Sequence, residues 1–191
     1  MIVVKLGGSL GKAETLRPWL AALARAPGRA VVVPGGGAFA DCVRAEQPRM
    51  GFSDRAAHRM ALLAMEQYAL AMADLEPRLA LCASVAEIDA ALGRETIPVW
   101  LPSAMALADP AIAESWDVTS DSLAAWLAPR LRARRLALVK SVPAPVSLDP
   151  AALAASGAVD RAFPQFFAAA DVALDWIGPG EEARLARLLA V

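Results

Sequence analysis

The sequence predicts an α/β fold with a mainly parallel central sheet and helices on both of its faces. Short apolar runs alternate along the chain with longer stretches of helical periodicity, and Gly or Pro separates most of them. Strands that alternate with helices pair in parallel, and the helices then cover both faces of the sheet. Ligands of such sheets bind at the carboxyl ends of the strands, so the residues at those ends are the first candidates for function.

Six strands are expected. The first, 2–6, is the run IVVKL before Gly7-Gly8, and the second, 30–34, is the run AVVVP before three glycines. The other four are short apolar runs at 78–83, 97–101, 135–140 and 171–177. Residues 102–118 are rich in Pro and Asp and are expected to be irregular.

Helices are expected between these strands. Residues 10–26 carry apolar side chains at helical spacing until Pro27-Gly28, and residues 38–47 are expected to be helical until Pro48. The remaining helices are expected at 54–74, 84–92, 119–131, 151–156, 163–169 and 180–190.

Length and charge exclude several classes of protein. The 191 residues suffice for one domain whose core needs no disulfide or metal. The 19 basic and 20 acidic side chains nearly cancel, so a broad surface for nucleic acid or membranes is not expected. No apolar run approaches the roughly 20 residues that span a bilayer, and the first residues do not read as a secretory signal.

Cysteine and histidine are scarce. Cys42 and Cys82 lack CxxC spacing, so reduced thiols and a cytoplasmic location are expected. A dedicated metal site is not expected, because the chain has one histidine and no cysteine cluster. That histidine, His58, is either a packed helical residue or a contact for an anionic substrate, which the neighbouring Arg55 and Arg59 would suit.

The first candidate site follows the first strand. Gly7 and Gly8 would expose backbone N–H groups to a ligand, Ser9 adds a hydroxyl, and the next helix points its positive end at the same place. An ordinary turn is the alternative. Lys5 favours a phosphate site, because the chain has three lysines against sixteen arginines and a charge at a buried strand end is costly.

The P-loop pattern G-x-x-x-x-G-K-[ST] does not fit this stretch. Leu6 stands where the pattern has its first glycine, and Ala13 stands where it has Ser or Thr. Lys12 is therefore expected to be a solvated helix residue.

A second glycine loop, Gly35-Gly36-Gly37, follows the second strand. It formally matches the dinucleotide fingerprint G-x-G-x-x-[GA], and Asp54 lies near the position of the fingerprint's acidic residue. A dinucleotide site leaves Lys5 without a role. Two glycine loops on adjacent strand–helix units better suit two anionic groups that face each other, as in phosphoryl transfer.

A third candidate lies at the helix that follows the irregular stretch. Asp117 or Thr119 could cap this helix, with Asp121 favoured in its first turn by the helix dipole. Alternatively, Asp121 holds lysine side chains in place or contacts a metal-bound nucleotide. Lys140 ends the fifth strand, and it is either a surface lysine or the partner of Lys5 in neutralising a transferring phosphoryl group.

Three motifs together resemble those of the amino acid kinase family. They are VVKLGGS at 3–9, PGGG at 34–37 and TSDS at 119–122, in the order of that family. The resemblance implies a three-layer αβα sandwich, a single domain over 1–191, and ATP-dependent phosphorylation of a carboxylate, phosphate or carbamate oxygen. It also implies ATP and Mg²⁺ as cofactors and a small phosphorylated metabolite as substrate.

The resemblance further implies roles for individual residues. The catalytic residues would be Lys5, Asp121 and Lys140. Phosphates and nucleotide would be bound by Gly7, Gly8, Ser9, Lys140 and Ser141. The acceptor would be bound by Gly35, Gly36, Gly37, His58, Asp117 and Thr119.

A narrower likeness concerns the segments AHRMALLAMEQY at 57–68 and SWDVTSDSLA at 115–124. Both resemble the (aminomethyl)furanylmethyl phosphate kinases of methanofuran biosynthesis. This likeness implies that a phosphate monoester is phosphorylated to a diphosphate. Family habit and an Ala-rich, Trp-containing surface predict a homodimer, although Trp19, Trp100 and Trp126 are expected in the core.

The second half of the chain departs from the family. Residues 1–131 would form the acceptor and phosphate half, and 132–191 a reduced nucleotide half. KSVPA at 140–144 replaces the family's TDVxG-like turn, and no lysine follows Lys140. A catalytically weakened or inactive binding protein is therefore an alternative, and a dinucleotide-dependent oxidoreductase built on 35–40 is a second one.

Overall fold

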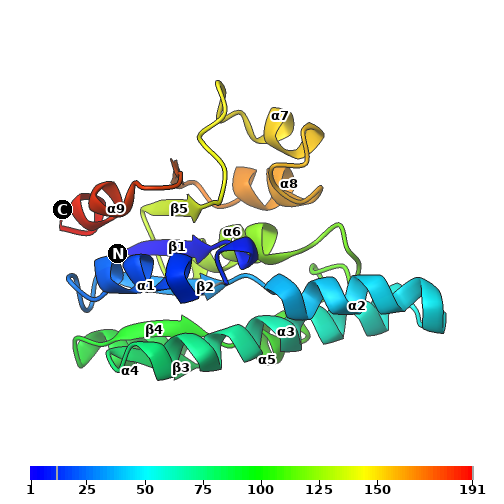
Figure 1. The fold of residues 1–191 in the computed structure, drawn as a ribbon, viewed down its shortest axis with the longest axis horizontal. Coiled ribbons are helices and arrows are strands. Elements are labelled where there is room, and N and C mark those ends of the chain that lie inside the picture. The colour runs from blue at the N-terminus through cyan, green and yellow to red at the C-terminus, as the bar shows by residue number, and fades with distance from the viewer. Residues whose placement is uncertain (12, 191) are drawn as a thin grey trace.

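The central sheet has the predicted parallel arrangement. In the computed structural model, which describes residues 1–11 and 13–190, six strands form one sheet in the order β3-β4-β2-β1-β5-β6. Figure 1 labels five of them, β1 to β5. The strands are β1 (Ile2–Leu6), β2 (Ala30–Pro34), β3 (Leu79–Cys82), β4 (Ile97–Trp100), β5 (Arg135–Val139) and β6 (Ala173–Ile177). Every neighbouring pair in this order is parallel.

The middle of the sheet explains why the glycine loops and two lysines converge. All residues of β1 and β2 are buried, as expected of strands covered on both faces. In the register of the sheet, Lys5 of β1 lies between Val33 of β2 and Leu138 of β5. The three strands therefore end side by side, and the residues after them meet at one edge of the sheet.

Helices cover both faces of the sheet (Figure 1). They are α1 (Ala13–Leu23), α2 (Gly37–Met50), α3 (Asp54–Leu75), α4 (Val85–Gly93), α5 (Ser103–Ala106), α6 (Ser120–Arg130), α7 (Pro150–Ala155), α8 (Phe163–Ala168) and α9 (Glu182–Ala190). A short 3-10 helix, η1 (Gly8–Leu10), precedes α1. The prediction for Lys12 lies outside the described residues.

Two predictions of local structure were wrong. Pro48 does not end α2, which continues to Met50 and stops at Gly51, a residue in the left-handed region with φ of 73°. The missing N–H of Pro48 leaves the carbonyl of Arg44 without its helical partner, but both residues are exposed and water can replace the bond. The stretch 102–118, expected to be irregular, contains the one-turn helix α5.

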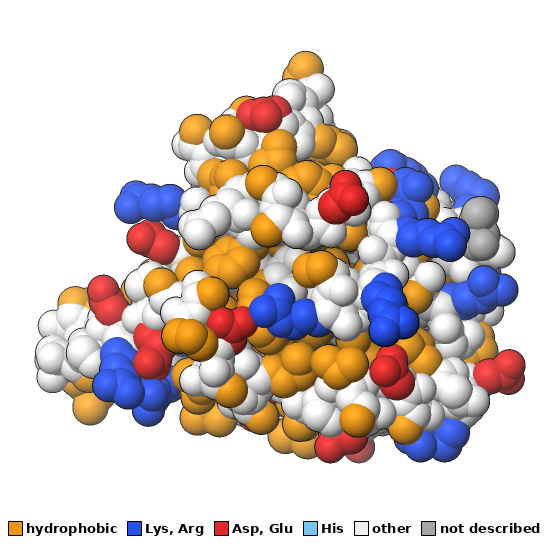
Figure 2. Space-filling model, turned by 180° about the vertical axis from the view of Figure 1, so that it is seen from behind, with side chains coloured by type: hydrophobic (Ala, Val, Ile, Leu, Met, Phe, Trp, Pro, Cys, Tyr) orange, Lys and Arg blue, Asp and Glu red, His pale blue; other side chains and the backbone are white. Residues whose placement is uncertain are grey.

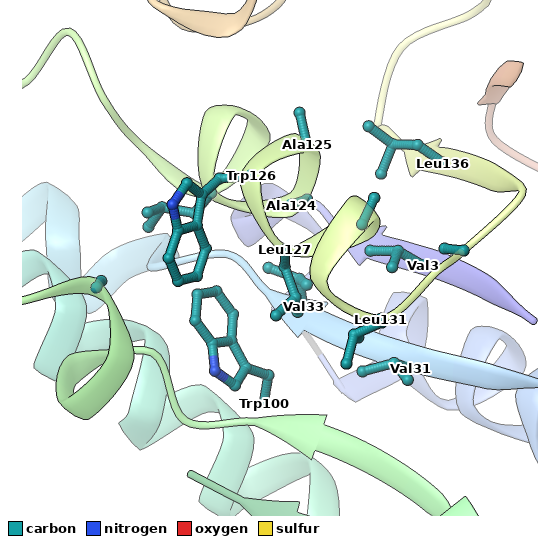
Figure 3. Packing of buried hydrophobic residues seen from close by; sticks show 14 of the residues in the cluster. Val3, Val31, Val33, Trp100, Ala124, Ala125, Trp126, Leu127, Leu131 and Leu136 are labelled. Carbon is teal, nitrogen blue, oxygen red and sulfur yellow. The ribbon is translucent and has the colours of Figure 1, made fainter. Parts of the chain in front are cut away.

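The core consists of two apolar clusters, one on each face of the sheet. Side chains of α1 and α9 belong to one cluster, and those of α4, α6 and α8 belong to the other. In the second cluster the rings of Trp100 and Trp126 stack with centroids 5.8 Å apart, against Leu127 and Val33 (Figure 3). This packing fixes α6, and with it Asp121, over the end of the sheet.

The prediction that Trp19, Trp100 and Trp126 lie in the core is confirmed, because their large apolar rings fill the space between sheet and helices. Trp176 is buried as well, so the predicted Trp-containing surface is wrong. Trp116 is half-buried at the edge of a cavity described below.

The surface carries mixed charges. On the face seen in Figure 2, basic, acidic and hydrophobic side chains are interspersed. Among the described residues, no helix combines the length and the apolar character that crossing a membrane requires.

Candidate active site

The two glycine loops pack backbone against backbone. The N–H of Gly35 donates to the carbonyl of Leu6 at 2.8 Å, which joins the end of β2 to the end of β1. A Cβ on Gly8 would lie 2.3 Å from the nitrogen of Gly37, and one on Gly35 would lie 2.3 Å from the nitrogen of Gly8. Neither loop could carry a side chain at these positions without moving the other loop.

The second loop leads directly into α2. Gly36 caps this helix without a side chain, so N–H groups of the first turn remain available to a ligand. Gly37 has φ of 49°, and a Cβ there would lie 2.4 Å from Cε2 of Tyr68. The hydroxyl of Tyr68 accepts a long hydrogen bond of 3.4 Å from the N–H of Ala38. The helix dipole favours an anion at this end.

Asp121 lies between the two strand-end lysines. Its Oδ1 is 2.9 Å from Nζ of Lys5, and its Oδ2 accepts a hydrogen bond of 2.8 Å from Nζ of Lys140. Lys140 also donates to the carbonyl of Ala158 at 2.7 Å. All three charged side chains are at most 12% exposed. The structure thus brings the three predicted catalytic residues into one buried cluster.

Burial and charge act against each other in this cluster. Burial of Asp121 favours its neutral form, but Lys5 and Lys140 outweigh burial and lower the pKa of the carboxyl. For Lys140, burial and the like charge of Lys5 lower the pKa to about 8, although Asp121 favours the charged form. The single negative charge of Asp121 therefore does not by itself compensate the two ammonium groups that it holds.

Two serines border the lysines. Oγ of Ser9 donates to Oγ of Ser141 at 2.8 Å, which joins the loops after β1 and β5. Both hydroxyls are exposed at the sheet edge, beside the loops predicted to bind phosphates. Gly7 is held there as well, because its N–H donates to the carbonyl of Val139 at 2.9 Å.

A cavity of about 250 Å³ opens beside the glycine loops, between α2, α3 and the start of α6. Its apolar walls include Leu62, Met65 and Leu123. The predicted residues Gly8, Ser9, Gly36, Gly37, His58 and Thr119 also line it. The cavity can therefore hold a small molecule with an apolar body and an anionic end at the glycines.

His58 presents an unpartnered nitrogen in this cavity wall. Its Nδ1 lies 3.1 Å from the carbonyl of Ser115, so Nδ1 carries the proton of the neutral ring. Nε2 is buried and has no hydrogen-bond partner among the described residues. Burial lowers the pKa of His58, and the Ser115 carbonyl and Glu114 offset this only in part. A ligand in the cavity can supply the missing partner.

Two predicted contacts do not reach the cavity. Arg55 and Arg59 both pair with Glu114, at 3.2 and 2.6 Å, and neither guanidinium group lines the cavity. Asp117 is exposed and lies 3.6 Å from Arg161, on the far side of the segment that lines the cavity. Its predicted contact with the acceptor has no support in this geometry.

Two further cavity residues, Asp41 and Arg44, were not predicted from the sequence, and they lie beside Trp116. The guanidinium of Arg44 lies 4.2 Å from the ring centroid of Trp116 and pairs with Asp41 at 3.0 Å, and all three residues line the cavity. Nε1 of Trp116 donates to Gln47 at 2.6 Å. Because α2 supplies Arg44 and the loop before α6 supplies Trp116, only the fold brings them together.

The helix cap of α6 also differs from the prediction. Thr119 occupies the cap position, but its side chain makes no capping bond. Asp160, 41 residues further on, accepts hydrogen bonds from the N–H and the hydroxyl of Thr119. No local pattern could have indicated this cap, because the two segments meet only in the folded chain.

Residues 1–151 match the Amino acid kinase family. The chain belongs to this family. The family expected from the glycine loops and the TSDS segment is thus confirmed, over most of the chain's length.

One curated relative is a [5-(aminomethyl)furan-3-yl]methyl phosphate kinase from Methanocaldococcus jannaschii. It is 28% identical over 146 residues, which cover 74% of this chain and 66% of the relative. The match thus spans slightly less than two thirds of the relative's length.

Solved kinases share the fold of this member of the amino acid kinase family. Uridylate kinase from Archaeoglobus fulgidus aligns with a TM-score of 0.73 and 17% identity, over 99% of this chain and 95% of that one. UMP kinase from Bacillus anthracis aligns with a TM-score of 0.75 and 12% identity, over 99% of this chain and 91% of that one. Carbamate kinase from Giardia lamblia bound to AMP-PNP aligns with a TM-score of 0.58 and 13% identity, over 98% of this chain and 95% of that one. The predicted three-layer αβα sandwich is confirmed.

Proposed function

We propose that the protein is an ATP-dependent small-molecule kinase that phosphorylates a phosphate monoester to a diphosphate. The observation that carries this proposal is the cluster of Lys5, Lys140 and Asp121 at the junction of two glycine loops. Phosphoryl transfer needs fixed positive charge and correct alignment more than it needs covalent chemistry. The cluster offers fixed charge, and the adjoining cavity offers room for an acceptor.

The lysines would neutralise the transferring phosphoryl group. The ammonium groups of Lys5 and Lys140 are held before any ligand binds, so little reorganisation is needed when negative charge develops. Asp121 has both carboxylate oxygens engaged by these lysines, which suits it to orient them rather than to accept a proton. N–H groups of the glycine loops would hold the phosphates of donor and acceptor.

ATP and Mg²⁺ are the proposed cofactors. Lys5, Lys140 and the loop at Gly7-Gly8 suit the phosphates of a nucleotide. Among residues 1–11 and 13–190, no group of three or more His, Cys, Asp or Glu side chains could hold a metal ion. Mg²⁺ would therefore be bound mainly by the phosphates themselves, as is usual for this ion, and would neutralise part of their charge.

An (aminomethyl)furanylmethyl phosphate is the proposed acceptor. The relative from Methanocaldococcus jannaschii is named for such a substrate. Leu62, Met65 and Leu123 suit a small planar ring, and the glycine loops suit its phosphate. His58 would complete the site, because its free Nε2 can accept a hydrogen bond from the acceptor or bind a phosphate oxygen after protonation.

A transfer assay tests this proposal. A panel of phosphate monoesters is incubated with ATP and Mg²⁺, and diphosphate products are measured for the wild type and for Lys5→Met. We expect transfer to a furanylmethyl phosphate in the wild type and at least a 100-fold loss in the variant, with unchanged circular dichroism. Full activity of Lys5→Met would refute the assignment of Lys5.

Calorimetry separates the kinase from its alternatives. Binding of MgATP without transfer to any acceptor would favour an inactive family member. Binding of NAD(P) that is indifferent to Lys5→Met would favour the oxidoreductase and overturn the kinase.

We also propose a homodimer formed through α3 and the edge strand β3. Met60, Leu63 and Leu70 are 41%, 52% and 56% exposed and lie on one side of α3. Leu81 of β3 is 36% exposed, and β3 is the edge strand of the sheet. A second copy would cover this apolar side and the unpaired edge. Gel filtration tests it: Leu63→Glu should convert the dimer to a monomer, and a wild-type monomer contradicts it.

A further inference from the structure

The loop between α7 and α8 contacts Lys140 and also the helix that carries Asp121. Its Ala158 carbonyl accepts the second hydrogen bond of the Lys140 ammonium, at 2.7 Å. Two residues later, Asp160 reaches the first turn of α6, the helix that carries Asp121. Lys140 is the last lysine of the sequence, so no other lysine of this half could take its place.

The carboxylate of Asp160 is fully engaged by α6. Its Oδ2 accepts from the N–H of Thr119 at 3.1 Å, from the hydroxyl of Thr119 at 2.8 Å and from the N–H of Ser122 at 3.0 Å. Its Oδ1 accepts from the hydroxyl of Ser122. Four donors facing one carboxylate satisfy its ionised form, and a negative charge is favoured at a helix N-terminus.

We propose that Asp160 is a positioning residue for phosphoryl transfer, which fixes the first turn of α6 and thereby places Asp121 between the two lysines. Asp121 supplies one negative charge beside the ammonium groups of Lys5 and Lys140, and Asp160 supplies the second. The inference rests on the proposed kinase function, and it assigns a role to the loop at 156–162 that the family motifs do not contain.

The charges around Asp160 give it an electrostatic effect as well. Burial and the like charge of Asp121 raise the pKa of Asp160, while its hydrogen bonds with Ser122 and Thr119 lower it. In turn, Asp160 favours the charged form of Lys140, against burial and Lys5.

The other groups that face this cluster carry little net charge. Arg161 and Asp117 form a surface pair beside it at 3.6 Å, and β6 contributes the uncharged ring of Trp176, 5.5 Å from Nζ of Lys140. Loss of the Asp160 charge should therefore let Lys140 release its proton at lower pH.

The test compares Asp160→Asn with Asp149→Asn. Asp149 caps α7 by accepting from the N–H of Ala152 at 2.8 Å, and it is exposed, so the control removes the charge of a capping carboxylate outside the cluster. We expect Asp160→Asn to lower kcat at least 10-fold and to move the alkaline limb of kcat/KM to lower pH. We expect Asp149→Asn to change neither.

A second readout does not depend on turnover. Competitive acetylation followed by peptide mass spectrometry gives the titration midpoint of Lys140 in each variant, even if no acceptor is phosphorylated. In Asp160→Asn this midpoint should move to lower pH. If Asp160→Asn is less stable but keeps the Lys140 midpoint and the kcat of the wild type, the proposal is overturned, and Asp160 is only a structural cap of α6.

A further variant covers the case in which Asp160→Asn does not fold. Ser122→Ala removes one donor to Asp160 and keeps both carboxylates. We expect a lower kcat with an unchanged Lys140 midpoint, and an unchanged kcat would overturn the proposal. If the wild type itself fails to transfer phosphate while Lys140 responds to Asp160 as described, the kinase function fails and the coupling between the two residues stands.

Discussion

Replacement of Asp121 by Asn should destabilise the protein strongly at neutral pH and less at alkaline pH. The substitution keeps the shape of the side chain and removes the one carboxylate that Lys5 and Lys140 share at 2.9 and 2.8 Å. Two buried ammonium groups would then face each other across an uncharged amide.

The magnitude follows from the charges. A pKa of about 8 for Lys140, against 10.5 for the free side chain, already corresponds to about 3 kcal/mol of unfavourable free energy at neutral pH. Two unit charges ~5 Å apart repel by ~3 kcal/mol at an effective dielectric constant of about 20. Removal of one member of a buried ion pair generally costs about 3–5 kcal/mol, and we expect a loss in this range for Asp121→Asn at pH 7.

The pH dependence has a definite sign. Lys140 has a lower pKa folded than unfolded, so the unfolded chain binds more protons between about pH 8 and 10.5 and stability rises with pH in this window. At pH 9.5 the folded protein has largely released the Lys140 proton. Repulsion in Asp121→Asn is then smaller, so the loss of stability should shrink.

Urea unfolding followed by Trp fluorescence measures both effects, at pH 7 and pH 9.5. Asp175→Asn is the control, because Asp175 accepts two hydrogen bonds of 2.9 Å from Arg135. Arginine does not release its proton in this range, so the control should lose the same amount at both values. A loss below 1 kcal/mol for Asp121→Asn, or a loss that does not shrink at pH 9.5, would show that Asp121 does not hold apart two repelling ammonium groups.

Three further predictions concern Lys140, Gly37 and His58. kcat/KM should fall as the pH rises through about 8, because Lys140 loses its charge in the free enzyme, and a flat profile to pH 10 contradicts this. Gly37→Ala should lower the free energy of unfolding by about 2 kcal/mol more than Gly51→Ala, as measured by urea unfolding. Both glycines have positive φ, but a Cβ at Gly51 meets nothing within 4 Å, whereas a Cβ at Gly37 meets the ring of Tyr68. Equal losses in the two variants would contradict this prediction. Because burial lowers the pKa of His58, the unfolded chain binds this proton more readily, and the stability of the wild type falls as the pH drops below about 6.5. The melting temperature of His58→Gln should therefore fall less steeply towards pH 5 than that of the wild type.

The strand-end residues could be predicted from the sequence because their signals are local. Lys5 and Lys140, two of the three lysines of the chain, end apolar runs, and a parallel sheet brings such ends to one edge whatever the details of the helices. The meeting of these two lysines followed from this. That Asp121 joins them was one of two interpretations of its segment and was implied by the family resemblance, and the structure shows all three together.

The contacts that could not be predicted join segments far apart in the chain. Asp160 caps α6 from 38 residues away, and Glu114 neutralises Arg59 from 55 residues away. A sequence pattern shows that a helix needs a cap or that arginines flank a histidine. It does not show which distant side chain caps the helix or pairs with the arginines, because the packing of the helices determines which segments meet.

The contact between the glycine loops also sets the spacing of the two phosphates in the proposed reaction. Where Gly8 meets Gly35 and Gly37, the wall between the proposed sites of donor and acceptor consists of backbone. Its thickness follows from the hydrogen-bonded spacing of β1 and β2 and does not vary with any side-chain rotamer. The walls formed by α2 and α3 could therefore change to admit a different acceptor, while the reacting atoms keep their separation.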